Sequence, residues 1–195
     1  MSHKFLTEVE IHQLLSLAEM NKRDLALLYL AASTALRSSD LLRVKVSDVI
    51  DQDGDIIRLL RLKMKKTSRY IERPLREDCR NAIREWIGSR DDSNPYLFCQ
   101  MNRGYITNRQ PINRSQYHRA MKKYLGLMYH NSDIQGCSTH TLRRSVAKLV
   151  HNLTGKIVVA QQILGHSSPV HTIRYLDPEE TQATANKVVL DELKF

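Results

Sequence analysis

Apolar residues recur at helical spacing from the start of the chain. Thr7 and Glu10 have the spacing of a capping box, in which each side chain bonds the other residue's backbone amide. An apolar stripe accompanies them, made up of Val9, Ile11, Leu14, Leu15, Leu17 and Ala18. The strongly apolar segment Leu25–Leu36 comes next, and Ser38 or Ser39 is placed to cap a short helix after it. We therefore predict three successive helices, with the second at the centre of the core.

β-branched and extended segments replace this pattern in the next part of the chain. They are Val46–Ile50, Asp55–Leu62 and Arg69–Leu75, separated by Asp53-Gly54 and by Lys66-Thr67-Ser68. An Asp-Gly pair between two such segments is a strong hairpin signal. We predict one small antiparallel sheet of three short strands here.

Helical periodicity returns after these strands and continues to the end of the chain. The predicted helices cover residues 76–89, 112–125, 139–152 and 156–164, followed by a short helix that opens at Pro169 and a weaker one over residues 179–193. Gly165 stands where a helix can end in the left-handed conformation. The predicted fold class is α+β: mainly α-helical, with one small three-stranded antiparallel sheet.

Composition indicates an ordinary globular protein. The 195 residues are 42% hydrophobic and 26% charged, which suits one domain with a sizeable core. No segment approaches the roughly 20 apolar residues of a membrane span, and the first residues lack the apolar core of a signal peptide. Cys79, Cys99 and Cys137 are far apart and in no metal-ligand spacing, so we expect buried thiols in a reducing compartment. We therefore expect a cytoplasmic protein.

Charge is unevenly distributed along the chain. The net charge is +9, yet residues 176–195 hold five acids and two lysines, which leaves +12 on the rest. A basic surface steers polyanions, and nucleic acid is the commonest such partner. The acidic tail is better suited to contact with protein. Since many basic proteins bind no nucleic acid, charge alone favours such a partner only modestly.

Some side chains could carry chemistry, although each also has a plain structural explanation. His140 and Arg143 follow Ser138-Thr139, a candidate helix cap, at a spacing that puts both on one helix face. Amides at such a helix start suit a phosphate, but for this motif alone an ordinary basic helix surface is the favoured explanation. Arg37 follows the apolar helix. Its planar guanidinium could donate to two phosphate oxygens, or its charge could simply interact favourably with the negative C-terminal end of the helix dipole. Neither motif is specific by itself.

The turn and the helix end further along add two more candidates. Lys65 and Lys66 lie between the last two predicted strands, where a lysine is usually solvated but could also donate a proton to a leaving oxygen. His166 follows Gly165, and Tyr175 comes nine residues after His166. A tyrosine at a helix end most often packs and makes one hydrogen bond. A nucleophilic tyrosine needs a base and a cationic pocket, and this chain offers both.

Taken in chain order, these residues resemble the tyrosine recombinase (phage integrase) family. The matching motifs are Phe5-Leu6-Thr7, Ala35-Leu36-Arg37-Ser38-Ser39-Asp40, Lys66, His140-x-x-Arg143, Leu164-Gly165-His166 and Tyr175. Each motif is weak evidence by itself, but the probability that all of them occur by chance in this order and spacing is very small. The resemblance implies the family's catalytic domain over residues 1–176, and a tail helix over residues 177–195 that can be exchanged between protomers. The family's usual N-terminal DNA-clamping domain does not precede these motifs, so the length resembles either that of the compact fimbrial-switch invertases or that of a longer recombinase from which this domain has been removed.

The resemblance also implies roles for single residues. Arg37 and Arg143 match the pair that clamps the scissile phosphate, and Tyr175 matches the nucleophile. His140 would serve as acid or base, and His166 would hydrogen-bond the phosphate.

Lys66 matches the hairpin lysine that protonates the leaving 5′ oxygen, and its distance to Pro74 favours it over Lys65, which stays an alternative. Arg144 stands where the family often has a second histidine, and the turn lacks the family's common glycine. The sequence shows no clustered carboxylates of the kind a two-metal nuclease needs. We therefore expect no metal and no cofactor.

A basic segment at residues 114–124 is apolar on its other side. Its exposed cations are expected to be Arg114, Arg119, Lys122 and Lys123. They could contact the DNA backbone or a groove, or they could simply be solvated; the two interpretations are about equally supported.

The function implied by the resemblance is site-specific DNA recombination through a 3′-phosphotyrosine intermediate, giving integration, excision or inversion. The implied partners are double-stranded DNA with specific recombination sites and further copies of the chain, as dimers to tetramers on DNA at the nucleoid. Two alternatives stay open: a catalytically silent DNA-binding accessory protein of the same fold, and a type IB topoisomerase-like enzyme.

Overall fold

The computed structural model describes residues 5–102, 105–130, 134 and 136–176, and the side chains of these residues outside 101–109. Its elements, in chain order, are α1 (Glu8–Leu17), α2 (Lys22–Thr34), α3 (Ser38–Leu41), the 3-10 helix η1 (Val46–Asp48), β1 (Leu59–Lys63), β2 (Tyr70–Pro74), α4 (Glu77–Gly88), β3 (Cys99–Asn102), β4 (Tyr105–Pro111), α5 (Arg114–Met128), α6 (Thr141–Thr154), α7 (Ile157–Leu164) and α8 (Pro169–Leu176). In this part of the chain, no helix is long and apolar enough to cross a membrane.

Local sequence signals explain several helix ends. The predicted capping box is present at α1, where Glu10 N donates to Thr7 Oγ1 at 3.2 Å and Thr7 N donates to Glu10 Oε2 at 2.7 Å. Gly165 closes α7 with a φ of +56°, and α8 opens at Pro169, both as predicted. The predicted serine caps are wrong, because Arg37 and His140 themselves occupy the N-cap positions of α3 and α6.

Two two-stranded antiparallel sheets stand in place of the single three-stranded sheet that the sequence suggested. β1 and β2 form the expected hairpin, with Lys63 opposite Tyr70. The first predicted strand is wrong: residues 46–48 form η1, and only Ile50 pairs, in one bridge to Ile56. β3 and β4 were not predicted. The fold class, mainly helical with small antiparallel sheets, is confirmed.

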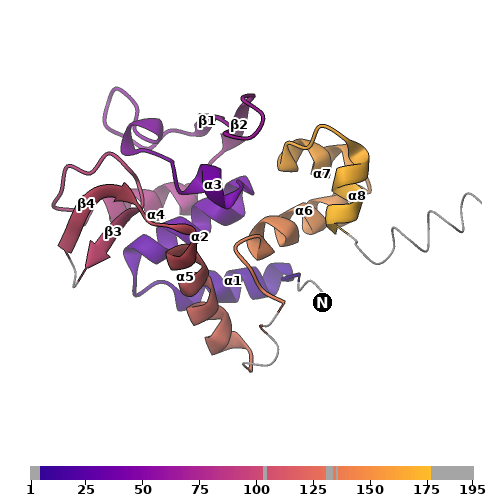
Figure 1. The fold of residues 1–195 in the computed structure, drawn as a ribbon, viewed down its shortest axis with the longest axis horizontal. Coiled ribbons are helices and arrows are strands. Elements are labelled where there is room, and N and C mark those ends of the chain that lie inside the picture. The colour runs from indigo at the N-terminus through magenta and orange to yellow at the C-terminus, as the bar shows by residue number, and fades with distance from the viewer. Residues whose placement is uncertain (1–4, 103–104, 131–133, 135, 177–195) are drawn as a thin grey trace, which may run out of the picture.

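A large core fills the body of the molecule, and a second, small core lies at one end. The main core joins α1, α2, α4 and α5, with fully buried side chains that include Leu14, Leu27, Leu28, Ile83, Phe98 and Tyr117. The small core consists of Ala147, Ala160, Leu164 and Leu176, from α6, α7 and α8. Figure 1 shows α7 and α8 beyond α6, at the end of the molecule away from β3 and β4.

Candidate active site

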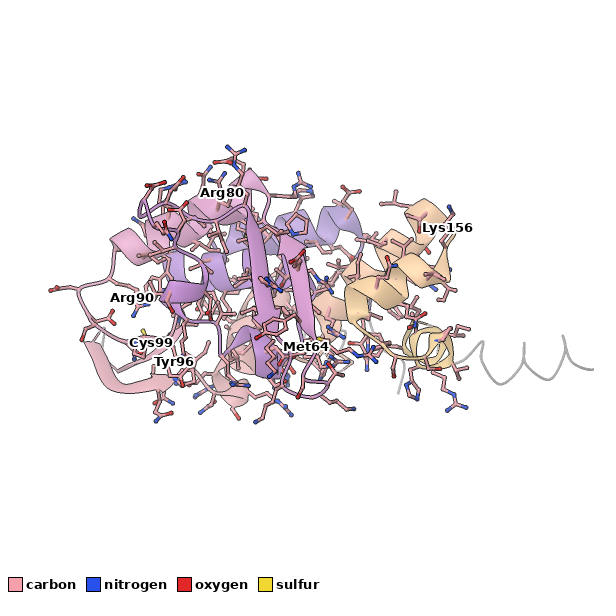
Figure 2. The ribbon with its side chains drawn as sticks, turned by 90° about the horizontal axis from the view of Figure 1, so that it is seen from above. Met64, Arg80, Arg90, Tyr96, Cys99 and Lys156 are labelled. Carbon is pink, nitrogen blue, oxygen red and sulfur yellow. The ribbon has the colours of Figure 1, made fainter. Side chains whose placement is uncertain are left out.

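The C-terminal end of α2 carries the first candidate. α2 ends at Thr34, and Ala35 turns the chain with a left-handed φ of +48°. Arg37 follows with an extended backbone and is half-buried. Its Nη1 lies 3.5 Å from Sδ of Met64, a buried residue directly after β1. The β1–β2 hairpin therefore lies against Arg37, and Figure 2 shows Met64 at the turn end of this hairpin.

Arg143 on α6 lies at the centre of the site and is only 4% exposed. Its Nη1 donates to the carbonyl of Ala35, and its Nη2 donates to the carbonyl of Leu164 at 2.6 Å. Burial lowers the pKa of Arg143 to about 10, against the opposing effect of nearby Tyr175. The guanidinium therefore stays charged at neutral pH and joins α6 to the ends of α2 and α7.

His140 precedes α6 as its N-cap and is half-buried. Burial lowers the pKa of His140, and the positive charges of Arg143, Arg144, Arg114 and Arg37 lower it further. Its buried Nδ1 has no hydrogen-bond partner among the residues that the structure describes. A neutral imidazole with an unused nitrogen can accept a proton.

His166 and Tyr175 lie together at the ends of α7 and α8. Their ring centroids are 5.4 Å apart, with the rings perpendicular. His166 Nδ1 lies 3.2 Å from Oγ1 of Thr172, which is fully buried. Burial lowers the pKa of His166 to about 4, and the charges of Arg143 and Arg37 contribute to the shift. His166 is therefore neutral at physiological pH.

The Tyr175 hydroxyl lies in a cationic environment. The guanidinium carbons of Arg144 and Arg143 lie 5.1 Å and 5.9 Å from the centre of its ring. Tyr175 Oη is buried and lies close enough to Arg143 for the phenol to raise the pKa of that guanidinium. An anionic tetrahedral group placed beside this oxygen would meet several positive charges.

Lys66 lies in the exposed turn between β1 and β2. Its charge is among those that lower the pKa of His166, which places the lysine on the same side of the molecule as the site. Lys65, the alternative, is also exposed, and its backbone amide donates to Asp40 Oδ1 at 2.8 Å. The backbone of Lys65 thus bonds the turn to α3, and the charge of Lys66 is close enough to His166 to lower its pKa.

The six predicted catalytic residues converge from the end of α2, the β1–β2 turn, α6, the end of α7 and α8. The predicted DNA contacts lie elsewhere, on the exposed side of α5, and only Arg114 acts electrostatically on His140. Lys123 packs its ammonium over the Tyr124 ring at 4.8 Å. In the described residues, no three His, Cys, Asp or Glu side chains gather as a metal site would require.

Three residues beside the site were missed by the sequence analysis: Asp40, Met64 and Thr172. Asp40 is 6% exposed and supports both Arg143, through its charge, and the hairpin turn, through the Lys65 amide. The available signal was an acidic residue three positions after Arg37, on the same side of a short helix. Met64 and Thr172 gave no comparable signal, because their partners Arg37 and His166 belong to other elements, 27 and 6 positions away.

Comparison with known proteins defines the class. Residues 4–182 match the phage integrase family. The chain therefore belongs to that family, the tyrosine recombinases, and the resemblance read from the sequence is confirmed.

Individual relatives agree with this membership. The chain is 32% identical over 173 residues to the probable integrase/recombinase YoeC of Bacillus subtilis (strain 168), covering 88% of this chain and 87% of YoeC. It is 27% identical over 166 residues to the tyrosine recombinase XerA of Pyrococcus furiosus, covering 85% of this chain and 54% of XerA. The chain thus spans most of the first relative but about half of the second.

Solved structures share the fold. The crystal structure of XerA recombinase matches with a TM-score of 0.71 at 25% identity, covering 100% of this chain and 66% of that one. The XerH site-specific recombinase bound to its difH substrate matches with a TM-score of 0.65 at 19% identity, covering 97% of this chain and 55% of that one.

Proposed function

We propose that this chain is a site-specific DNA recombinase that cleaves and rejoins DNA through a 3′-phosphotyrosine intermediate, with residues 1–176 as the catalytic domain. The observation that carries the proposal is the environment of the Tyr175 hydroxyl. The oxygen is buried. The Tyr175 ring that carries it has the guanidiniums of Arg143 and Arg144 over it and the neutral imidazole of His166 perpendicular to it. Membership of the tyrosine recombinase family supports the same reaction.

Phosphate binding is assigned to Arg37 and Arg143. A guanidinium offers several N–H donors in a planar fork, which suits two phosphate oxygens at once. Arg143 uses one hydrogen each of Nη1 and Nη2 on backbone carbonyls, which leaves its other N–H groups for the phosphate. The backbone bonds hold the guanidinium in one orientation, so little reorganisation is needed as charge develops.

His166 is assigned a hydrogen bond to a phosphate oxygen. Its low pKa leaves one ring nitrogen protonated and the other with a lone pair. Nδ1 faces the Thr172 hydroxyl, and when that hydroxyl donates to Nδ1 the hydrogen of His166 is on Nε2. This tautomer directs a donor toward the phosphate.

The proposed reaction is an exchange of phosphodiesters. Tyr175 Oη bonds to the phosphorus, the bond between phosphorus and the 5′ oxygen breaks, and the phenol proton passes to a base. Neutral His140 accepts that proton, and the Lys66 ammonium donates one to the leaving 5′ oxygen. Because one phosphodiester replaces another, attack by a different 5′ hydroxyl reverses the step without ATP. The cationic side chains stabilise the transition state in place of a metal ion.

DNA with specific recombination sites is the proposed partner, and further copies of the chain assemble on it. The basic side chains of α5, Arg114, Arg119, Lys122 and Lys123, are exposed and suited to phosphate contacts. XerH, which shares the fold, was solved bound to its difH substrate, and lambda integrase was solved as a dimer bound to a core site. The predicted exchanged tail, residues 177–195, lies outside the described residues and stays a prediction. A DNA substrate would place the protein at the nucleoid.

A suicide substrate with a nick beside the cleavage point tests the reaction. The wild-type protein should form a covalent complex that survives denaturing electrophoresis, because the short 5′ fragment diffuses away before rejoining. Tyr175→Phe should abolish this complex and keep DNA binding, since only the nucleophilic oxygen is removed. Tyr70→Phe, on the exposed face of β2, is the matched control and should behave as wild type.

The outcomes separate the competing functions. A covalent complex formed by Tyr175→Phe would refute the assigned nucleophile. DNA binding with no covalent complex from the wild-type protein would favour the silent accessory protein. Relaxation of supercoiled plasmids that carry no recombination site would favour the topoisomerase-like activity.

A further inference from the structure

α7 and α8 carry two of the catalytic candidates on a small core of their own. His166 directly follows Gly165 at the end of α7, and Tyr175 belongs to α8. The buried apolar residues that hold these helices together are Ala147, Ala160, Leu164 and Leu176, none of which belongs to the main core. Apolar packing therefore ties α7 and α8 chiefly to α6. A polar contact with the body that carries Arg37 further fixes how the pair sits against it.

Arg73 on β2 makes that contact. Its Nη2 donates to the carbonyls of Gln162 at 3.0 Å and Ile163 at 2.8 Å, both in the last turn of α7. Its Nε donates to the carbonyl of Thr34, the last residue of α2, at 3.2 Å. Its Nη1 donates to the carbonyl of the preceding residue, Glu72, at 2.8 Å. One guanidinium thus joins the hairpin strand to two helix ends.

Arg73 and Arg143 act on adjacent carbonyls of the same two helix ends. Arg143 takes the carbonyls of Ala35 and Leu164, directly after those that Arg73 takes. Carbonyls of a last helical turn lack intrahelical partners and carry the negative end of the helix dipole. Two cations between the ends of α2 and α7 therefore hold together groups that would otherwise repel each other. Burial lowers the pKa of Arg73, as expected for a guanidinium withdrawn from water.

We propose that Arg73 is a positioning residue that sets the placement of His166 and Tyr175 relative to Arg37 and the hairpin lysine. The proposal rests on the recombinase function proposed above. All three side-chain nitrogens of Arg73 donate to backbone carbonyls, and unlike Arg143 it is assigned no contact with the reacting phosphate. Its removal should displace the α7 end without removing a group that touches DNA. Small displacements of reacting groups cost large factors in rate.

The test compares Arg73→Met and Arg73→Lys with a matched control, Arg80→Met. Arg80 on α4 is a buried arginine that likewise donates to a backbone carbonyl, that of Ile56 at 3.0 Å, and its other hydrogen bonds go to Glu77 and Asp55 rather than to the ends of α2 or α7. Figure 2 shows it well apart from Met64 and the turn end of the hairpin. Arg73→Lys keeps the positive charge and a long flexible side chain. A lysine ammonium, however, lacks the planar guanidinium that donates to the ends of both α2 and α7.

Three measurements apply to each variant: the single-turnover rate of covalent complex formation, the affinity for DNA, and hydrogen exchange over residues 157–176. Both Arg73 variants should cleave about 10- to 100-fold more slowly, bind DNA within about twofold of wild type, and exchange faster in that segment. Arg80→Met should lose stability without faster exchange there, and should cleave at close to the wild-type rate.

Cleavage by both Arg73 variants at the rate of Arg80→Met would overturn the proposal, and so would unchanged exchange over residues 157–176. A wild-type protein that forms no covalent complex would instead refute the recombinase function. In that case the exchange measurement, which needs no DNA, still decides whether Arg73 holds α7 in place.

Discussion

Gly165 offers a sharp test of how closely the hairpin and the α7 end must fit. A β-carbon at Gly165 would lie 3.0 Å from Cε and 3.2 Å from Sδ of Met64, closer than side-chain atoms normally approach. The same sulfur lies 3.5 Å from Nη1 of Arg37. Gly165→Ala should therefore push Met64 against a residue that is assigned to the phosphate. Gly155 ends α6 in the same left-handed conformation, and a β-carbon there would meet nothing within 4 Å.

The size of the effect follows from two contributions. Alanine in the left-handed region costs about 1–2 kcal/mol, offset by about 0.4–1 kcal/mol from the lower entropy of the unfolded chain. Gly155→Ala and Gly165→Ala share this loss of roughly 1 kcal/mol. Gly165→Ala adds an overpacking cost of about 1 kcal/mol, near the low end of the usual range because the methyl group of Met64 can turn aside. The expected losses are about 1 and about 2 kcal/mol.

Urea unfolding measures the two stabilities, and cleavage of the suicide substrate measures the consequence for the site. Gly155→Ala should cleave as wild type does, whereas Gly165→Ala should cleave about tenfold more slowly because Arg37 is displaced. Adding Met64→Leu, whose branched side chain is one atom shorter and has no atom at the position of Cε, should restore part of the rate in the Gly165→Ala background. Equal stability losses with equal cleavage rates for the two alanine variants would refute the reasoning.

Three further outcomes are expected. Arg37→Lys should slow cleavage nearly as much as Arg37→Ala, since a point charge cannot replace the guanidinium fork, and near-normal turnover would contradict that role. Because the folded pKa of His166 lies below its unfolded value, stability should fall as pH drops from about 6.5 toward 4, by about 1 kcal/mol between pH 7 and 5 after allowance for partial exposure. His166→Asn should reduce that fall. If the urea midpoint drops between pH 7 and pH 5 by the same amount in this variant as in wild type, His166 is not its source. Lys122→Gln and Lys123→Gln should each lower the salt dependence of DNA affinity by roughly one ion, whereas exposed Lys22→Gln on α2 should not; equal slopes for all three would remove α5 from the interface.

The helices and the β1–β2 hairpin were largely predictable, whereas the first predicted strand and the β3–β4 pair were not. The capping box at Thr7 and the left-handed Gly165 depend on groups within a few residues, so the sequence reports them directly. Residues 46–48 have the β-branched composition of a strand, yet Val46 N donates to the carbonyl of Pro95, far along the chain, and the segment forms a 3-10 helix. Strand pairing needs a partner, and composition does not reveal where that partner lies.

The candidate site divides in the same way. Sequence alone identified the candidate residues, because arginine, histidine, lysine and tyrosine in the family's order can be recognised without coordinates; their chemical roles are part of the proposed function. Only the tertiary structure decided how they are held: Arg143 reaches the carbonyl of Ala35 across 108 positions, and Arg73 reaches that of Ile163 across 90. Such contacts depend on which helix ends the cores bring face to face. The carbonyls at those helix ends have no partner within their own helix, and they accept hydrogen bonds from the arginines that lie between them.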